Sequence, residues 1–232
     1  MEEAVAIIVA AGASHRMGSD KLFLPLAGKP LLAHTLAAFE TCAQISRIVV
    51  VVADHNRARV EELAANFPKV GPVVPGGEHR RDSVAAGLRA VPESAELIAI
   101  HDAARPLVEP GDLLRALEAA AAFGAAALAR PVTDTLKRAS SDADGDLPVV
   151  SSSVDRDCLY AMETPQAFQR RFIFEAYDTV LQAGDIVTDE VTALQAHGHP
   201  VRLVMASRPN PKVTFPGDLY LVEALVAANA RR

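Results

Sequence analysis

The sequence predicts an α/β fold with a mostly parallel sheet and helices on both faces. Apolar runs suited to buried strands alternate with helical segments, which is typical of a parallel sheet covered by its crossover helices. Half of the 232 residues are hydrophobic and 22% are charged, so the chain can bury a substantial core. Because no linker, repeat or low-complexity tract divides the chain, we expect one Rossmann-like domain over residues 1–232.

The first part of the chain supplies most of this sheet. Apolar runs predict buried strands at 4–10 and 47–53 and further strands at 70–74 and 97–101. A weaker strand is expected at 125–131, because alanine is a poor strand former. Helices are expected between them at 30–39, 56–67, 82–90 and 110–123. Pro30 suits a first helical turn, and Gly124 stands where a helix ends.

The pattern changes after residue 131. Segments 133–138 and 147–154 are extended around a polar tip, which predicts a β-hairpin arm that protrudes from the sheet over about 133–156. The remaining elements are expected to be helices at 171–182, 189–196 and 216–230 and a strand at 201–205.

Composition excludes several classes of protein. A formal net charge of −6 argues against binding a nucleic acid polymer. Cys42 and Cys158 are far apart, so a disulfide framework or a structural zinc site is not expected, and the reducing cytoplasm is the expected compartment. The N-terminus is acidic where a signal peptide would be basic, and no apolar run reaches the roughly 18 residues of a membrane span.

Four segments could carry chemistry, and each follows a strand, where ligands of parallel sheets bind. In the first, Ala10, Ala11 and Gly12 allow a ligand to approach the backbone, and Arg16 and Lys21 add two cations, which suits a triphosphate. A turn with ordinary surface cations explains the same residues equally well. Neither a P-loop nor a GxGxxG fingerprint is present, which disfavours a hydride-transfer enzyme.

The second segment, 75–83, is a Gly-rich turn that enters a helix. Asp82 and Ser83 are natural helix-capping residues, although the Ser83 hydroxyl could instead face a nucleobase. Arg80 and Arg81 are interpreted as solvated charges.

The third and fourth segments each place a charged side chain after a strand. Asp102 could hold a ribose hydroxyl or a metal ion, and Arg105 could meet an anion, although a buried Asp–Arg ion pair would have the same sequence. A lone lysine is usually a surface charge, but Lys212 follows two prolines that fix its approach, which favours a lysine aimed at a ligand.

Further short stretches continue this series nearly to the end of the chain. The full set is Ala10-Ala11-Gly12, Arg16-Met17, Lys21, Gly76-Gly77, Arg80, Asp82-Ser83-Val84, His101-Asp102-Ala103-Ala104-Arg105-Pro106, Pro131-Val132, Asp134-Thr135, Val154-Asp155-Arg156, Thr164-Pro165-Gln166, Thr188-Asp189-Glu190 and Lys212-Val213-Thr214. In order and spacing they resemble the 2-C-methyl-D-erythritol 4-phosphate cytidylyltransferase family of isoprenoid-precursor enzymes. The sequence departs from that pattern at Val9, Ser14 and Glu78, where the family often has proline, glycine and aspartate.

The resemblance implies a role for each candidate residue. Small residues would read the cytosine: Ala10, Ala11, Gly12, Gly77 and Ser83. Two residues would face the ribose: Asp102 and Ala103. Three catalytic cations would surround the α-phosphate: Arg16, Lys21 and Lys212. Four residues would hold the acceptor's phosphate and polyol: Arg105, Thr135, Arg156 and Thr188.

The implied reaction joins CTP to 2-C-methyl-D-erythritol 4-phosphate in the non-mevalonate pathway and releases pyrophosphate. The acceptor is a phosphate monoester that is mostly dianionic near neutral pH, so positioning and charge neutralisation are required rather than a general base. The expected cofactor is Mg²⁺, held mainly by substrate phosphates and not by a protein metal site. In this family the hairpin arm embraces a second subunit, so we expect a homodimer in which Thr135 and Arg156 act in the partner's site.

Other interpretations stay open. A ribitol 5-phosphate cytidylyltransferase would share the fold and the reaction, although Asp134-Thr135 and Val154-Asp155-Arg156 favour methylerythritol phosphate. A nucleotidyltransferase acting on a molybdenum pterin is disfavoured by the arm. A non-catalytic nucleotide-sensing module is disfavoured by the three aimed cations and would release no pyrophosphate.

Overall fold

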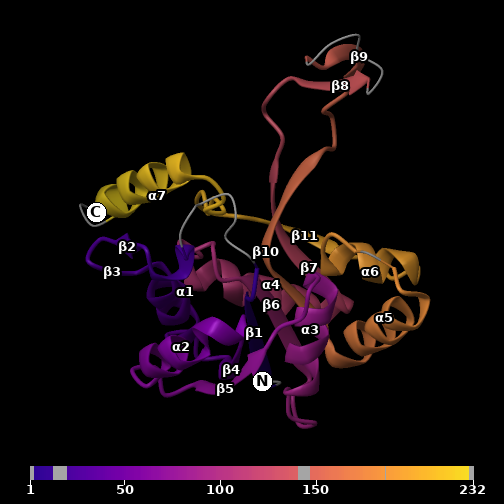
Figure 1. The fold of residues 1–232 in the computed structure, drawn as a ribbon. Helices are drawn as coiled ribbons and strands as arrows, with labels where there is room; N and C mark the ends of the chain where they lie inside the picture. The colour runs from indigo at the N-terminus through magenta and orange to yellow at the C-terminus, as the bar shows by residue number, and fades with distance from the viewer. Residues whose placement is uncertain (1–2, 13–19, 141–146, 186, 230–232) are drawn as a thin grey trace.

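The structure is a computed structural model that describes residues 3–12, 20–140, 147–185 and 187–229. Its centre is a seven-stranded sheet with the strand order β11-β7-β10-β6-β1-β4-β5. The hairpin arm rises from one edge of this body, and helices lie around the sheet (Figure 1). The α/β class and the largely parallel sheet predicted from the sequence are confirmed.

The strands of the large sheet are mostly parallel. β1 pairs in parallel with β4 and β6, β4 with β5, and β11 with β7, whereas β10 is antiparallel to both β6 and β7. Their bounds are β1 Ala4–Ala10, β4 Ile45–Val52, β5 Val70–Pro75, β6 Leu97–Asp102, β7 Ala125–Pro131, β10 Tyr160–Gln169 and β11 Arg202–Met205.

Helices connect these strands and cover the sheet. They are α1 Leu31–Glu40, α2 Arg57–Ala64, α3 Arg80–Arg89, α4 Pro110–Phe123, α5 Arg170–Ala183, α6 Glu190–Ala196 and α7 Pro216–Asn229. Short elements complete the chain: the 3-10 turns η2 Lys21–Phe23 and η3 Asp54–Asn56, and the two-residue strands β2 Pro25–Leu26 and β3 Lys29–Pro30. Among the described helices, none has the length and apolar character needed to cross a membrane.

The core has one layer on each face of the sheet, because neighbouring residues of a strand point to opposite faces. Ile8 of β1 packs in the layer that contains Leu36 of α1 and Leu117 of α4. Ile7, the preceding residue, packs in the opposite layer with Leu88 of α3. Burial on both faces explains the apolar run of β1 and the apolar stretches 48–52 of β4 and 97–100 of β6.

Strand β10 is not predicted by the sequence pattern, which indicates no element at 160–169. A proline in a central strand normally argues against strand structure, and Glu163, Thr164 and Gln166 are polar at positions that are buried. The pairing of β10 with β7 shifts register between Met162 and Gln166, which accommodates the proline. Thr164 bonds to His101 and Asp102 of β6, and Gln166 bonds to Asp189 and Val191 at the start of α6, so these two buried polar side chains are partnered.

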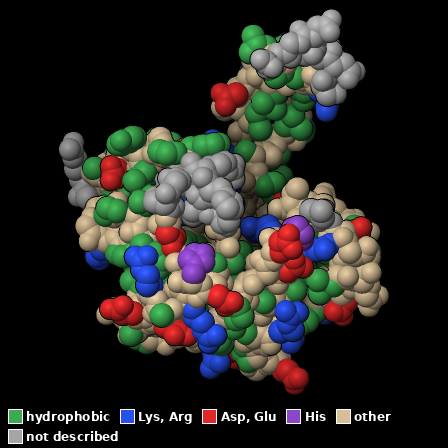
Figure 2. Space-filling view, viewed as in Figure 1, with side chains coloured by type: hydrophobic (Ala, Val, Ile, Leu, Met, Phe, Trp, Pro, Cys, Tyr) green, Lys and Arg blue, Asp and Glu red, His purple; other side chains and the backbone are tan. Residues whose placement is uncertain are grey.

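The hairpin arm is confirmed as a structural element. Strand β8, Leu136–Ser140, pairs antiparallel with β9, Val149–Val154, in a separate two-stranded sheet that projects from the body (Figure 1). Hydrophobic side chains gather on the arm (Figure 2), and Leu147, Val149 and Val150 are all more than half exposed. An exposed apolar surface of this kind is typical of a segment that meets another surface.

Candidate active site

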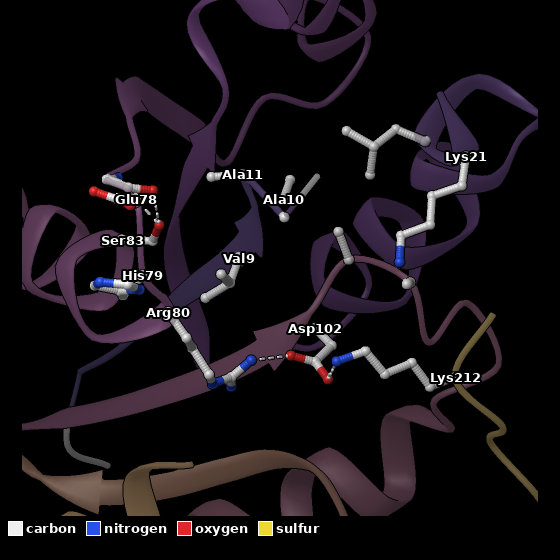
Figure 3. Close-up of a pocket in the computed structure, with 15 residues that line it drawn as sticks. Val9, Ala10, Ala11, Lys21, Glu78, His79, Arg80, Ser83, Asp102 and Lys212 are labelled. Atoms are coloured by element: carbon white, nitrogen blue, oxygen red, sulfur yellow. Dashed lines mark hydrogen bonds and ion pairs between the residues drawn. The ribbon is translucent and has the colours of Figure 1, made fainter. Parts of the chain in front are cut away.

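The carboxyl ends of β1, β5 and β6 open onto one pocket of about 400 Å³. Loops from far-apart parts of the sequence form its wall (Figure 3). It is lined by Val9, Ala10, Ala11, Gly12, Lys21, Leu22, Gly77, Glu78, His79, Arg80, Ser83, Asp102, Ala103, Ala104 and Lys212. All seven residues predicted to bind the nucleotide line this pocket, as do two of the three predicted catalytic cations. The third, Arg16, lies outside the described residues.

Small residues on one wall allow two loops to lie against each other. A Cβ atom on Gly76 would lie 2.3 Å from the Cβ of Ala11 and 2.8 Å from the Ser83 hydroxyl oxygen, so only glycine fits there. The backbone N–H of Gly77 donates to the Ser83 hydroxyl over 3.2 Å. The loop after β5 is thereby fixed against the end of β1, and small residues of both segments line the pocket.

Helix α3 starts earlier than the sequence predicts, and this places Arg80 in the pocket. Asp82 accepts a hydrogen bond from the backbone N–H of His79, so the helix begins at Arg80 rather than at Asp82. The prediction that Arg80 and Arg81 are solvated charges is wrong. Arg80 pairs with two carboxylates, and Arg81 donates to the backbone carbonyl of Asp185 over 2.6 Å.

Asp102, at the end of β6, is the centre of a charge cluster. Its Oδ1 lies 2.5 Å from Nη1 of Arg80, and its Oδ2 lies 2.8 Å from Nζ of Lys212 (Figure 3). Burial alone would raise the pKa of Asp102, but the charges of Arg80 and Lys212 outweigh burial and hold that pKa well below its usual range. Asp102 is therefore an anion that holds Lys212 at the pocket edge.

Lys21 and Lys212 come from opposite ends of the chain and reach the same side of the pocket (Figure 3). Nζ of Lys21 donates to the backbone carbonyl of Val213 over 3.2 Å, and the N–H of Val213 donates to the carbonyl of Ala104 over 2.8 Å. These contacts tie the loop that carries Lys212 to both η2 and the loop after β6. The structure thus brings together the two described members of the predicted cation set.

The four residues predicted to bind the acceptor do not line the pocket. Thr135 and Arg156 are exposed at the arm, where Arg156 donates to the backbone carbonyl of Thr133. Thr188 is exposed beside α6, with its hydroxyl 3.4 Å from that of Thr192.

Arg105 is mostly buried and is used to join loops. Its Nη1 donates to the carbonyl of Asn210 over 2.9 Å, its Nη2 donates to the carbonyl of Met162 over 3.3 Å, and its Nε lies 3.7 Å from Asp102. The side-chain Oδ1 of Asn210 accepts from the N–H of Leu107. The arrangement favours the buried ion pair that the sequence left open as the alternative for Arg105.

Thr164 contacts Asp102 directly, and His101 contacts Thr164. The sequence does not indicate either as a site residue. Nε2 of fully buried His101 lies 3.0 Å from the carbonyl of Arg105, so this nitrogen donates, and Nδ1 accepts from the Thr164 hydroxyl over 2.9 Å. Thr164 in turn accepts from the N–H of Asp102. Burial lowers the pKa of His101 to about 4, so the ring is neutral near pH 7 and serves as a fixed hydrogen-bonding group.

The described residues contain no group of three or more His, Cys, Asp or Glu side chains that could hold a metal ion. Asp102 and Glu78 are the carboxylates in the pocket wall. Magnesium that is bound through nucleotide phosphates needs few protein carboxylates, so these residues fit a metal that enters with its nucleotide.

A mostly parallel sheet with a pocket of small residues and cations at its strand ends defines a nucleotide-binding α/β enzyme. The family model of 2-C-methyl-D-erythritol 4-phosphate cytidylyltransferase, IspD, matches residues 4–228. The chain therefore belongs to this family of CTP-dependent nucleotidyltransferases, and the family and enzyme class predicted from the sequence are confirmed.

Individual relatives agree with this assignment over their full length. The chain is 39% identical to the 2-C-methyl-D-erythritol 4-phosphate cytidylyltransferase of Pelotomaculum thermopropionicum, over 100% of this chain and 98% of that protein. It is 41% identical to the protein of the same name in Dehalococcoides mccartyi strain CBDB1, covering 97% and 96%. The crystal structure of this enzyme from Thermus thermophilus superposes with a TM-score of 0.76 at 35% identity, covering 98% and 100% of the two chains.

Proposed function

We propose that this enzyme transfers the cytidylyl group of CTP to 2-C-methyl-D-erythritol 4-phosphate, forming 4-diphosphocytidyl-2-C-methyl-D-erythritol and pyrophosphate. Relatives at 39–41% identity carry the name of this activity. The observation that carries the proposal is the pocket in which Lys21 and Lys212 reach the same side as Asp102, beside a wall of small residues.

The nucleotide has a natural orientation in this pocket. The wall formed by Ala11, Gly77 and Ser83 suits the flat face and polar edge of cytosine. We expect Asp102, which is ionised and fixed by Arg80, to accept hydrogen bonds from the ribose hydroxyls. The phosphates would then extend toward Lys21 and Lys212, and Arg16, which lies outside the described residues, is proposed to join them.

The proposed reaction is an in-line displacement at the α-phosphorus. A phosphate oxygen of the acceptor forms the new P–O bond, the bond between the α-phosphorus and the bridging oxygen breaks, and pyrophosphate leaves with that electron pair. The acceptor is already mostly dianionic near pH 7, since its second pKa is about 6, so no proton must be removed. The enzyme's contribution is to neutralise the charge that gathers when a dianion approaches a triphosphate.

Lys212 is suited to this task because it can change partners. Its side chain is 40% exposed, and its ammonium group lies 2.8 Å from Asp102. When a phosphate oxygen approaches, the ammonium group can move onto it, while Asp102 keeps its contact with Arg80. Lys21 is held by the same loop through the carbonyl of Val213, so the two cations act on neighbouring oxygens.

Magnesium is proposed as the cofactor. When bound to the nucleotide's phosphates it would withdraw charge from them and ease the departure of pyrophosphate. Asp102 and Glu78 are the pocket carboxylates that could contact it or its water ligands. The chain's own cations remain responsible for orienting the α-phosphate.

The acceptor site is proposed to be completed by a second copy of the chain. Thr135 and Arg156 lie on the arm, outside the pocket. Hydrophobic side chains are exposed on this arm (Figure 2), and Leu147, Val149 and Val150 are among the exposed large hydrophobic residues. Burial of that apolar surface against a partner subunit would deliver the two polar residues to the partner's pocket. We propose a homodimer of this kind. We also propose that the protein is cytoplasmic, in agreement with the two unpaired cysteines among the described residues.

A pyrophosphate-release assay tests the proposed function. The purified chain is incubated with Mg²⁺, 2-C-methyl-D-erythritol 4-phosphate and either CTP, ATP, GTP or UTP, and the CTP reaction is repeated with ribitol 5-phosphate. We expect release with CTP and methylerythritol phosphate above every other combination. Faster release with ribitol 5-phosphate would transfer the assignment to that acceptor, and no release with either acceptor would leave a nucleotide-sensing module as the better description.

A further inference from the structure

Glu190, the first residue of α6, is a buried carboxylate that the proposed reaction does not use. Its side chain has no exposed surface. Both oxygens are engaged by Arg80: Oε1 accepts from Nε over 3.2 Å and Oε2 accepts from Nη2 over 2.9 Å. Oε1 also accepts from the hydroxyl of Tyr177 over 3.1 Å. Glu190 is therefore a fully partnered anion in the protein interior.

The contact continues from Arg80 into the pocket. The third guanidinium nitrogen, Nη1, lies 2.5 Å from Oδ1 of Asp102, whose other oxygen lies 2.8 Å from Lys212. Four charges of alternating sign thus follow one another from the interior to the substrate pocket: Glu190, Arg80, Asp102 and Lys212. In the sequence, Glu190 stands two residues after Thr188, and no local pattern indicates that it contacts Arg80.

The geometry of arginine explains what Glu190 contributes. The guanidinium group is planar and its donors have fixed directions, so a bidentate contact on one edge fixes where the remaining nitrogen points. Without Glu190, a guanidinium group that is 22% exposed at the pocket wall could turn toward a nucleotide phosphate or toward solvent. Asp102 would then lose the partner that fixes its carboxylate.

Stability alone is a weak reason for this arrangement. The desolvation of buried charges offsets most of their mutual attraction, and apolar residues of similar volume often replace a buried ion pair without loss of stability. Burial by itself would lower the pKa of Arg80, but Glu190 and Asp102 together raise it above its usual value, so the guanidinium group is firmly charged. A permanent cation beside a triphosphate pocket needs a fixed orientation.

We propose that Glu190 is a positioning residue for nucleotide binding: it fixes Arg80, which in turn fixes the Asp102 carboxylate between the ribose and Lys212. This inference rests on the proposed function, because it assumes that CTP occupies the pocket. Glu190 itself touches no substrate. Its removal should weaken CTP binding more than it affects the acceptor, since Thr188 is held separately by Thr192.

Two variants separate positioning from stability. Glu190→Gln keeps the shape of the side chain and removes its charge. The double variant Arg80→Met with Glu190→Leu replaces this ion pair by apolar side chains, so neither charge is left buried without the other. Its melting temperature is therefore expected to be higher than that of Glu190→Gln. Glu175→Gln is the matched control, because Glu175 lies on the neighbouring helix α5 with its side chain 64% exposed.

The dissociation constant of CTP is measured by equilibrium dialysis with labelled CTP and Mg²⁺, alongside the melting temperature and the KM of each substrate. We expect both variants to bind CTP about tenfold or more weakly than the wild type, with the control unchanged. A double variant that melts like the wild type and also binds CTP like the wild type would show a purely structural role and overturn the inference. Failure of the wild type itself to bind CTP would overturn the proposed function. The double variant therefore tests the role of Glu190, and the wild type tests the proposed function.

Discussion

Replacing Lys212 with alanine tests the central electrostatic claim. In the structure the ammonium group lies 2.8 Å from Asp102 and so can reach a phosphate oxygen that enters beside that carboxylate. At about 4 Å and an effective dielectric constant of about 20, two unit charges interact by about 4 kcal/mol. Loss of one comparable contact to a developing anion lowers turnover by roughly 10²–10³. We therefore expect a fall of that size in kcat for Lys212→Ala.

The fold should survive this change. Lys212 is 40% exposed, and the buried Asp102 carboxylate keeps Arg80 as a partner, so we expect the variant to stay folded with a lowered melting temperature. The assay is pyrophosphate release at saturating CTP and acceptor, with thermal unfolding measured on the same samples. Lys29→Ala, at an exposed position, is the control. Turnover of Lys212→Ala close to that of the wild type would refute the reasoning.

Three further changes test other parts of the structure. Arg156→Ala should raise the KM of the acceptor more than that of CTP, and equal effects would contradict its place at the acceptor. Gly76→Ala should raise the KM of CTP and lower the unfolding free energy by about 1–3 kcal/mol, because the added Cβ would lie 2.3 Å from that of Ala11. Gly111→Ala is the control, since a Cβ there meets nothing within 4 Å, and equal effects of the two changes would contradict the close packing at Gly76. His101 takes up its proton near pH 6.5 when unfolded but only near pH 4 when folded, so the unfolded state binds more protons between these values and stability falls as the pH falls through this window. Across this window the wild type should lose about 3 kcal/mol of unfolding free energy through His101. The unfolding free energy of His101→Gln should depend less steeply on pH there, and identical slopes for the two proteins would refute this role of His101.

Local pattern was sufficient for most of the fold because the parallel strands are buried on both faces. The apolar runs at 4–10 and 125–131 coincide with β1 and β7, since a strand covered on both sides has no polar alternation to obscure it. Strand β10 gave no such signal. Its burial depends on partners supplied by distant loops, for example the contact of Gln166 with Asp189, and no local pattern reveals those partners.

The candidate site was predictable where chemistry follows a strand directly. Asp102 comes at the end of β6, so topology alone places it at the binding edge of the sheet. The sequence pattern does not indicate the pairing of Arg80, because an arginine in a charged turn is usually solvated and only a small difference in where α3 begins directs it inward. It does not indicate the pairing of Glu190 either, because a glutamate in the first turn of a helix already has an ordinary explanation in the helix dipole.

Two residues whose burial the local sequence pattern does not predict, Thr164 and Arg80, both contact Asp102. Thr164 of β10 supports Asp102 through its backbone N–H, and Arg80 supports the carboxylate of the same residue. Burying polar groups in a central strand or on an inner helix face is costly unless each is paired. The pairing of Thr164 and Arg80 converges on one residue at the pocket, Asp102, so the cost of burying these two polar groups is met where a fixed orientation is needed. If these polar positions were only tolerated irregularities, apolar replacements at Arg80 and Glu190 would leave CTP binding intact, which the double variant measures directly.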